Sequence, residues 1–227
     1  MTQGPVAIIP ARGGSKRLPR KNIQPLLGHP LLEWPVKTAL DSGIFARVIV
    51  STDDLEVAEV ATRAGAEVLW RSDGLGSDSA TVVEVCLDVL GRLDQKPWCF
   101  CCIYATAALL LSEDVERSWA MMADGSVDGV MGVGEYALSP FQALIRKSHK
   151  WALLMPQYEK VQSQNYPDVV CSCGMIYWAQ TPIFECQQSF YLPNLEVYRI
   201  PRLRQCDMNT YEDLQFAELQ ARFVLQE

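Results

Sequence analysis

The sequence predicts an α/β fold in which a sheet built from βαβ units carries helices on both faces. Short apolar runs alternate along the chain with amphipathic segments, which is the pattern of such units. Polar and glycine-containing motifs follow several apolar runs, and ligands of open α/β sheets bind at the carboxyl ends of the strands. The chain has 227 residues, of which 49% are hydrophobic and 21% are charged. This composition is enough for one sizeable core, and we expect a single domain over residues 1–227.

The elements follow from the hydrophobic pattern, taken in chain order. Short apolar runs predict strands at Val6–Pro10, Val48–Ser51, Glu67–Trp70, Trp98–Tyr104, Gly129–Val133, Met175–Ala179 and Glu196–Ile200. The amphipathic segments between them predict helices at Pro30–Ser42, Leu55–Ala64, Thr81–Leu93, Glu113–Ala123 and Tyr211–Leu225. Thr210 precedes the last helix and Asp213 follows three residues later, which predicts a capping box at its start.

Residues 136–173 interrupt this alternation, because they are aromatic and polar with only scattered apolar positions. An extended hairpin is one interpretation of this stretch, and a large surface loop is the other. Loops of this length in compact domains are usually functional or disordered. We therefore expect the segment to have a role of its own.

The loop after the first predicted strand brings positive charge into an acidic chain, whose net charge is -7. Its cations are Arg12, Lys16, Arg17, Arg20 and Lys21. Gly13 and Gly14 are expected to adopt positive φ and to approach a ligand closely, while Ser15 donates its hydroxyl and bare backbone N–H groups complete an anion cradle. The pattern differs from the P-loop and from the dinucleotide fingerprint. It predicts a polyphosphate pocket, the alternative being a solvated basic turn.

Charge and composition also bear on partners and compartment. Net acidity argues against a nucleic-acid partner, and no apolar run approaches the ~20 residues that cross a membrane. Residues 1–5 lack the features of a secretory signal, so we expect a cytoplasmic protein without a membrane partner. The eight cysteines are expected to be thiols, with Cys99, Cys101 and Cys102 buried in a strand.

Further motifs follow the basic loop in order. They are VIVSTDD at Val48–Asp54, the RS and SD pairs within Arg71–Asp78, CCIYATA at Cys101–Ala107, SQN at Ser163–Asn165 and DMNTYEDL at Asp207–Leu214. Together they resemble the signature of the acylneuraminate cytidylyltransferases, which activate acidic sugars as CMP conjugates. The resemblance covers nearly the whole chain. The CCIYATA motif and the spacing from SQN to Gly174 most resemble the pseudaminic acid cytidylyltransferase branch.

The resemblance implies a Rossmann-like, GT-A-like nucleotide-diphospho-sugar transferase fold with a dimerisation arm at about 136–173 that reaches onto a second subunit. It implies a homodimer that takes CTP and an acidic nonulosonic sugar, pseudaminic acid being favoured, and makes CMP-sugar for cell-surface polysaccharide. The anomeric hydroxyl of the sugar would attack the α-phosphorus of CTP and release pyrophosphate. Positioning and charge stabilisation suffice for such a displacement.

The resemblance also assigns roles to residues. Arg12 and Lys21 are the catalytic candidates. The nucleotide-binding candidates are Arg12, Gly13, Gly14, Ser15, Lys21, Asn22, Arg71, Ser77 and Asp78, and the sugar-binding candidates are Tyr104, Thr106, Gln162 and Gln164.

Magnesium is the implied cofactor, with Asp207 and Asn209 as its candidate ligands. The family's common pattern has a second aspartate where this chain has Asn209. An amide oxygen coordinates a metal without contributing charge, so the departure predicts a weaker metal site.

The residues expected to bind the sugar depart further from the family's pattern. Gln162 stands where relatives commonly have an arginine, and the residues before Gly174 are Cys171, Ser172 and Cys173. Because a guanidinium binds a carboxylate bidentately, three interpretations stay open: a different sugar, a replacement cation such as Arg146 or Lys160, or loss of the sugar reaction. The alternative functions are a synthetase for N-acetylneuraminic, legionaminic or ketodeoxyoctonic acid and a non-catalytic nucleotide-binding relative.

Overall fold

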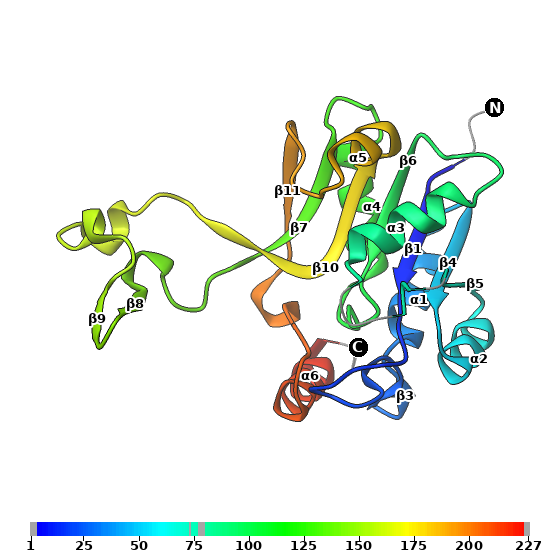
Figure 1. Cartoon of the computed structure of the whole chain (residues 1–227), viewed down its shortest axis with the longest axis horizontal. Coiled ribbons are helices and arrows are strands. Elements are labelled where there is room, and N and C mark those ends of the chain that lie inside the picture. The colour runs from blue at the N-terminus through cyan, green and yellow to red at the C-terminus, as the bar shows by residue number, and fades with distance from the viewer. Residues whose placement is uncertain (1–3, 73, 77–79, 225–227) are drawn as a thin grey trace.

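A seven-stranded sheet forms the centre of the computed structural model, which describes residues 4–72, 74–76 and 80–224. The strand order is β11-β7-β10-β6-β1-β4-β5 (Figure 1). The strands are β1 (Val6–Pro10), β4 (Arg47–Thr52), β5 (Glu67–Trp70), β6 (Cys99–Ile103), β7 (Gly129–Glu135), β10 (Val170–Gln180) and β11 (Leu195–Arg199). Only β10 runs antiparallel to its neighbours in this sheet. All seven predicted strands are present, and the α/β fold class is confirmed.

Five helices match the predicted ones: α1 (Glu33–Asp41), α2 (Leu55–Ala64), α3 (Val82–Gly91), α4 (Ser112–Met122) and α6 (Tyr211–Val224). At the start of α6, the Asp213 amide donates to Thr210 Oγ1 at 3.2 Å and the Thr210 amide donates to Asp213 Oδ2 at 2.8 Å. The predicted capping box is therefore confirmed. The predicted last residue, Leu225, lies outside the described residues.

Helix α5 (Thr181–Gln187) is absent from the prediction. It has 7 residues, and its buried side chains are Thr181 and Phe184. That is too short for a helical period to stand out from the apolar strand before it. The short elements are β2 (Pro25–Leu26), β3 (His29–Pro30) and the 3-10 helices η1 (Lys21–Ile23), η2 (Pro140–Gln142), η3 (Pro156–Tyr158), η4 (Ser163–Asn165) and η5 (Arg202–Arg204).

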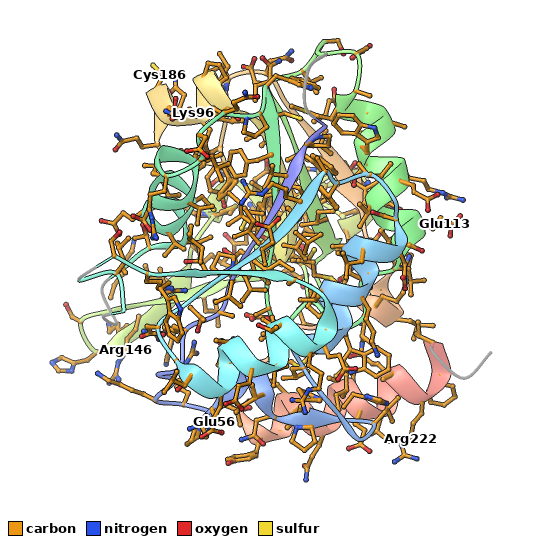
Figure 2. The ribbon with its side chains drawn as sticks, turned by 90° about the vertical axis from the view of Figure 1, so that its right-hand side faces the viewer. Glu56, Lys96, Glu113, Arg146, Cys186 and Arg222 are labelled. Carbon is orange, nitrogen blue, oxygen red and sulfur yellow. The ribbon has the colours of Figure 1, made fainter. Side chains whose placement is uncertain are left out.

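The central strands β1 and β6 are buried on both faces of the sheet, to which their successive side chains point in turn. In β6, Cys99 and Cys101 pack with α1, α2 and α4, whereas Phe100 and Cys102 pack with α3 and α5. Figure 2 shows side chains filling the space between the sheet and the helices. All eight cysteines are free thiols, as expected, and those of β6 are fully buried. No helix in the described part of the chain is long and apolar enough to cross a membrane.

Residues 136–169 form an arm that projects from the ends of β7 and β10 (Figure 1). Its antiparallel strands β8 (Leu144–Lys147) and β9 (Lys150–Leu153) confirm the predicted hairpin. The rings of Phe141, Tyr158 and Tyr166 form a small cluster, with centroids 4.4 to 5.8 Å apart. Leu138, at 86% exposed, and Trp151, at 66%, lie outside that cluster. The arm therefore presents apolar surface to its surroundings.

Candidate active site

Two adjoining cavities lie at the carboxyl end of the sheet. The first, of about 260 Å³, is lined by six of the predicted site residues: Arg12, Lys21, Asn22, Arg71, Tyr104 and Thr106. The second, of about 300 Å³, is lined by Ser15 and Asn209 together with the cations Arg12, Lys16, Arg17 and Lys21. Because Arg12 and Lys21 line both, the two cavities form one cleft with a mixed part and a strongly cationic part. Ser77 and Asp78 lie outside the described residues.

The two ends of the basic loop are joined by Asn22, a polar residue that is only 7% exposed. The Asn22 amide Nδ2 donates to the Arg12 carbonyl at 2.8 Å, which ties the end of the loop to its start. Leu18, in the middle of the loop, is fully buried and anchors it to the body. These contacts fix where Arg12 and Lys21 lie.

The expected positive φ at Gly13 and Gly14 is wrong, because neither residue has that conformation. Glycine is required at position 13 for a different reason, because the backbone there packs closely against Asp54: a Cβ on Gly13 would lie 2.5 Å from the Asp54 Cβ. The Gly13 N–H donates to Asp53 Oδ1 at 2.9 Å, so in this conformation it does not face a ligand. A Cβ on Gly14 would meet nothing within 4 Å.

Lys21 sits at the junction of the two cavities and its ammonium donates to the Met208 carbonyl at 2.9 Å. Burial is the main cause that lowers the pKa of Lys21, and Arg17 and Arg12 add to the effect while Asp207 opposes it. A partly desolvated ammonium among like charges is stabilised by an anionic ligand. The position therefore suits a phosphate.

Arg71 forms part of the wall of the first cavity. Its Nη1 donates to the Leu75 carbonyl at 2.9 Å, and its Nε donates to the Ser51 carbonyl at 3.4 Å. Burial is the largest cause that lowers the pKa of Arg71, while the carboxylate of Asp53 acts in the opposite direction. The guanidinium is thus fixed in orientation and faces the cavity with its charge partly balanced.

The candidate metal ligands differ in their availability. Asp207 is exposed and its charge acts on the Lys21 ammonium, whereas the Asn209 Oδ1 accepts a hydrogen bond from Arg17 at 2.7 Å. No cluster of three or more His, Cys, Asp or Glu side chains suitable for a metal occurs among the described residues. Mg²⁺ commonly binds through one or two carboxylates and substrate phosphates. Asp207 fits such a site, while Asn209 would first have to release Arg17.

The sugar candidates separate into two groups. Tyr104 and Thr106 line the first cavity, but Gln162 and Gln164 lie in the arm, where Gln164 Nε2 donates to Gln162 Oε1 at 2.6 Å. Figure 1 shows the arm extending away from the body of the molecule, and no arm residue lines either of the two adjoining cavities. Within one chain, the structure therefore does not bring these glutamines to the cleft.

A third cavity, of about 230 Å³, adjoins the first through Tyr104, a predicted sugar-binding residue that lines both. Ser172, Tyr177 and Phe190 are among its lining residues, and the hydroxyls of Ser172 and Tyr177 are 2.5 Å apart. Burial raises the pKa of Tyr177, so its phenol stays protonated at neutral pH. Tyr177 lies in an apolar run that is typical of a core strand, which is why no sequence signal pointed to it.

Comparison with known proteins shows the family of the chain. The model of the cytidylyltransferase family matches residues 6–165. A pseudaminic acid cytidylyltransferase of Campylobacter jejuni is 32% identical over 219 residues, which are 94% of each chain. A CMP-N,N'-diacetyllegionaminic acid synthase of Legionella pneumophila is 43% identical over 191 residues, which are 82% of this chain and 76% of that protein.

The fold has a solved counterpart as well. The structure of a CMP:2-keto-3-deoxy-manno-octonic acid synthetase complexed with CTP superposes with a TM-score of 0.71 at 17% identity, covering 99% of this chain and 100% of that one. At this identity the likeness shows the fold alone, a central sheet with helices on both faces. The family model and the full-length relatives carry the assignment further: this chain belongs to the cytidylyltransferase family and is a nucleotidyltransferase.

Proposed function

We propose that the protein transfers CMP from CTP to the anomeric hydroxyl of a nonulosonic acid, with pseudaminic acid as the favoured substrate. The observation that carries the proposal is the two-part cleft, in which Arg12 and Lys21 separate a mixed cavity from a cationic one. A nucleoside fits the first part and a triphosphate fits the second. The relative named for pseudaminic acid covers 94% of this chain, which favours that sugar.

The reaction needs no covalent intermediate with the protein. The anomeric oxygen forms a bond to the α-phosphorus and its hydroxyl proton is released to water. The bond from that phosphorus to the bridging oxygen breaks, and its electron pair leaves with pyrophosphate. Arg12, Ser15 and Lys21 hold the triphosphate, with Lys21 nearest the α-phosphate because it lies where the two cavities meet. Fixed cations aimed at developing charge stabilise such a transition state.

The nucleoside is held by groups that the protein has already oriented. Asn22 and Arg71 line the first cavity, and both are anchored by hydrogen bonds to backbone carbonyls. Ser77 and Asp78 are proposed to lie beside the nucleotide, as their place in the motif implies. A Cβ on Gly14 would meet no protein atom within 4 Å, so this glycine leaves room for a phosphate oxygen to approach the backbone.

Magnesium is the proposed cofactor, and Asp207 is the carboxylate that would hold it together with the phosphates of CTP. When bound, the ion neutralises charge on the phosphates. Asn209 contributes to the site mainly by holding Arg17 through the 2.7 Å hydrogen bond. Arg17 in turn lines the cationic cavity, so this pair orients a phosphate-binding cation.

The sugar is proposed to occupy the third cavity, next to Tyr104 and adjoining the cytidine site. The cation that binds the carboxylate of the sugar would come from a second subunit. The arm of that subunit carries Arg146 and Lys160, together with Gln162 and Gln164. Figure 2 shows Arg146 at the outer edge of the molecule. The exposed Leu138 and Trp151 of the arm support a homodimer, because apolar surface of this kind marks interaction sites.

We place the reaction in the cytoplasm, upstream of cell-surface polysaccharide. Free thiols at all eight cysteines support a reducing compartment. The proposed product, a CMP-sugar, is an activated donor for a glycosyl transfer.

Pyrophosphate release from CTP and Mg²⁺ tests the proposal, with pseudaminic, legionaminic, N-acetylneuraminic and ketodeoxyoctonic acids offered separately. We expect release with pseudaminic acid and little with the others. Release with legionaminic acid instead would agree with the relative that is 43% identical and would overturn the choice of sugar. No release with any of them, from folded protein that binds CTP, would contradict the enzymatic role.

A non-catalytic nucleotide-binding role is the second candidate, and the engaged amide of Asn209 favours it. Asn209→Asp separates the two roles, because it restores a charged metal ligand while keeping an oxygen for Arg17. A gain in turnover at low Mg²⁺ supports an enzyme with a weakened metal site. Absence of turnover in both proteins, with CTP binding intact, supports the binding role.

A further inference from the structure

The turn after β4 lies between the two loops that flank the nucleotide cavity. Asp53 faces both of them. Its Oδ1 accepts the Gly13 N–H of the basic loop at 2.9 Å. A Cβ on Gly76, in the loop that follows Arg71, would lie 2.7 Å from Asp53 Oδ2. Asp53 thus accepts a hydrogen bond from the basic loop through one carboxylate oxygen, while its other oxygen lies in the space that a side chain at position 76 would need.

The turn itself is fixed by neighbouring secondary structure. Asp54 caps α2, because its Oδ1 accepts the amides of Glu56 and Val57 at 3.0 Å each. The Asp54 amide donates to Thr52 Oγ1 at 3.2 Å, and Thr52 is fully buried at the end of β4. The position of Asp53 is therefore set by the sheet and by α2, and the loops take their position from it.

The loop contacts connect Asp53 to the residues proposed to bind CTP. Gly13 directly follows Arg12, which lines both parts of the cleft. On the other side, the carboxylate of Asp53 acts on the charge of Arg71, which lines the first cavity. The Asp53 carboxylate is hydrogen-bonded to protein, and it does not line the cavities described above.

We infer that Asp53 is a positioning residue for nucleotide binding: it holds the basic loop against the Arg71 loop, so that the CTP site is formed before CTP arrives. The inference rests on the proposed function. A preformed site spares the ligand the cost of ordering loops when it binds. Losing Asp53 should therefore weaken CTP binding without altering the chemistry of the reacting groups.

The test compares Asp53→Ala, Asp53→Asn and the control Asp128→Asn. Asp128 Oδ2 accepts the Asn194 N–H at 2.9 Å, the same kind of contact, but at the start of β7 and thus at the opposite end of the sheet. Calorimetric titration with CTP gives the Kd, and steady-state rates give KM and kcat. An asparagine at 53 keeps an oxygen that accepts from Gly13, whereas alanine does not.

We expect Asp53→Ala to raise the Kd for CTP about fivefold, which corresponds to ~1 kcal/mol for one exposed hydrogen bond. Asp53→Asn should recover most of the affinity, the KM for the sugar should not change, and Asp128→Asn should behave as wild type. A merely structural role would lower the folded, active fraction and leave the Kd unchanged. Wild-type affinity for CTP in Asp53→Ala would overturn the inference, and so would equal losses of CTP affinity in Asp53→Ala and Asp53→Asn. Failure of the wild type to bind CTP would instead refute the proposed function.

Discussion

Replacing Gly13 by alanine is expected to displace the basic loop, whereas the same change at Gly14 is not. A Cβ on Gly13 would lie 2.5 Å from both the Cβ and the Oδ2 of Asp54. Asp54 has little freedom to move away, because its carboxylate caps α2 and lies 3.4 Å from Arg20 Nη2. At Gly14 the added methyl group would meet no atom within 4 Å.

The size of the effect follows from these contacts. Inserting a methyl group into a packed site costs ~1–3 kcal/mol, and loss of a helix N-cap costs ~1 kcal/mol when the capping side chain is pushed aside. We expect Gly13→Ala to lower the free energy of unfolding by about 2 kcal/mol. For a chain of this size that corresponds to a drop in Tm of about 4–8 °C.

Thermal unfolding followed by circular dichroism provides the assay, with CTP titration as the second readout. Gly13→Ala should lower the Tm and weaken CTP binding, while Gly14→Ala should keep the wild-type Tm to within about 2 °C, as expected for a change of roughly 0.5 kcal/mol. An unchanged Tm in Gly13→Ala, or an equal drop in Tm in Gly13→Ala and Gly14→Ala, would refute the explanation that Gly13 is required by its close approach to Asp54.

The remaining predictions concern one catalytic cation, one buried ion pair and the arm. Lys21→Ala should lower kcat far more than CTP affinity, and equal losses in kcat and affinity would refute the role. Because burial lowers the pKa of Lys21 in the unliganded protein, the wild-type kcat/KM for CTP should fall on the alkaline side at a pH below 10.5. Arg204→Met should lower the free energy of unfolding by about 3–5 kcal/mol in denaturant unfolding, because it leaves the buried Asp114 carboxylate without its cation. As the control, Arg117→Met removes an exposed ion pair and should lower the free energy of unfolding by about 0.5 kcal/mol or less. Trp151→Glu should convert a dimer to monomers in sedimentation analysis, whereas an unchanged mass would argue against the arm as the interface.

The strands could be predicted because burial on both faces leaves continuous apolar runs, as in β1 and β6. Helix α5 could not, because so short a helix around Phe184 carries no measurable period. The glycines of the basic loop were recognised, but their predicted conformation was wrong. Nothing local to Gly13 reveals that Asp54, 41 positions later, would occupy the space of its missing side chain.

Some site residues could likewise be predicted from the sequence pattern, whereas others depend on tertiary packing. Arg12, Lys21 and Thr106 belong to polar motifs at strand ends, so their convergence could be predicted from topology. Tyr177 and Phe190 could not be found in this way, because aromatic residues in apolar runs are usually core and only the packing shows that these two line a cavity. Gln162 and Gln164 lie in the arm, away from the cleft of their own chain, and their proposed place at the cleft of a second subunit could not be predicted from a single sequence.

Determining a crystal structure with CTP and Mg²⁺ bound would test the central claim most directly. We expect the triphosphate along Arg12, Ser15 and Lys21, the nucleoside beside Asn22 and Arg71, and the third cavity open next to Tyr104 to receive a sugar. Nucleotide density in a different cavity, or a triphosphate that makes no contact with Lys21, would contradict this assignment of the cleft.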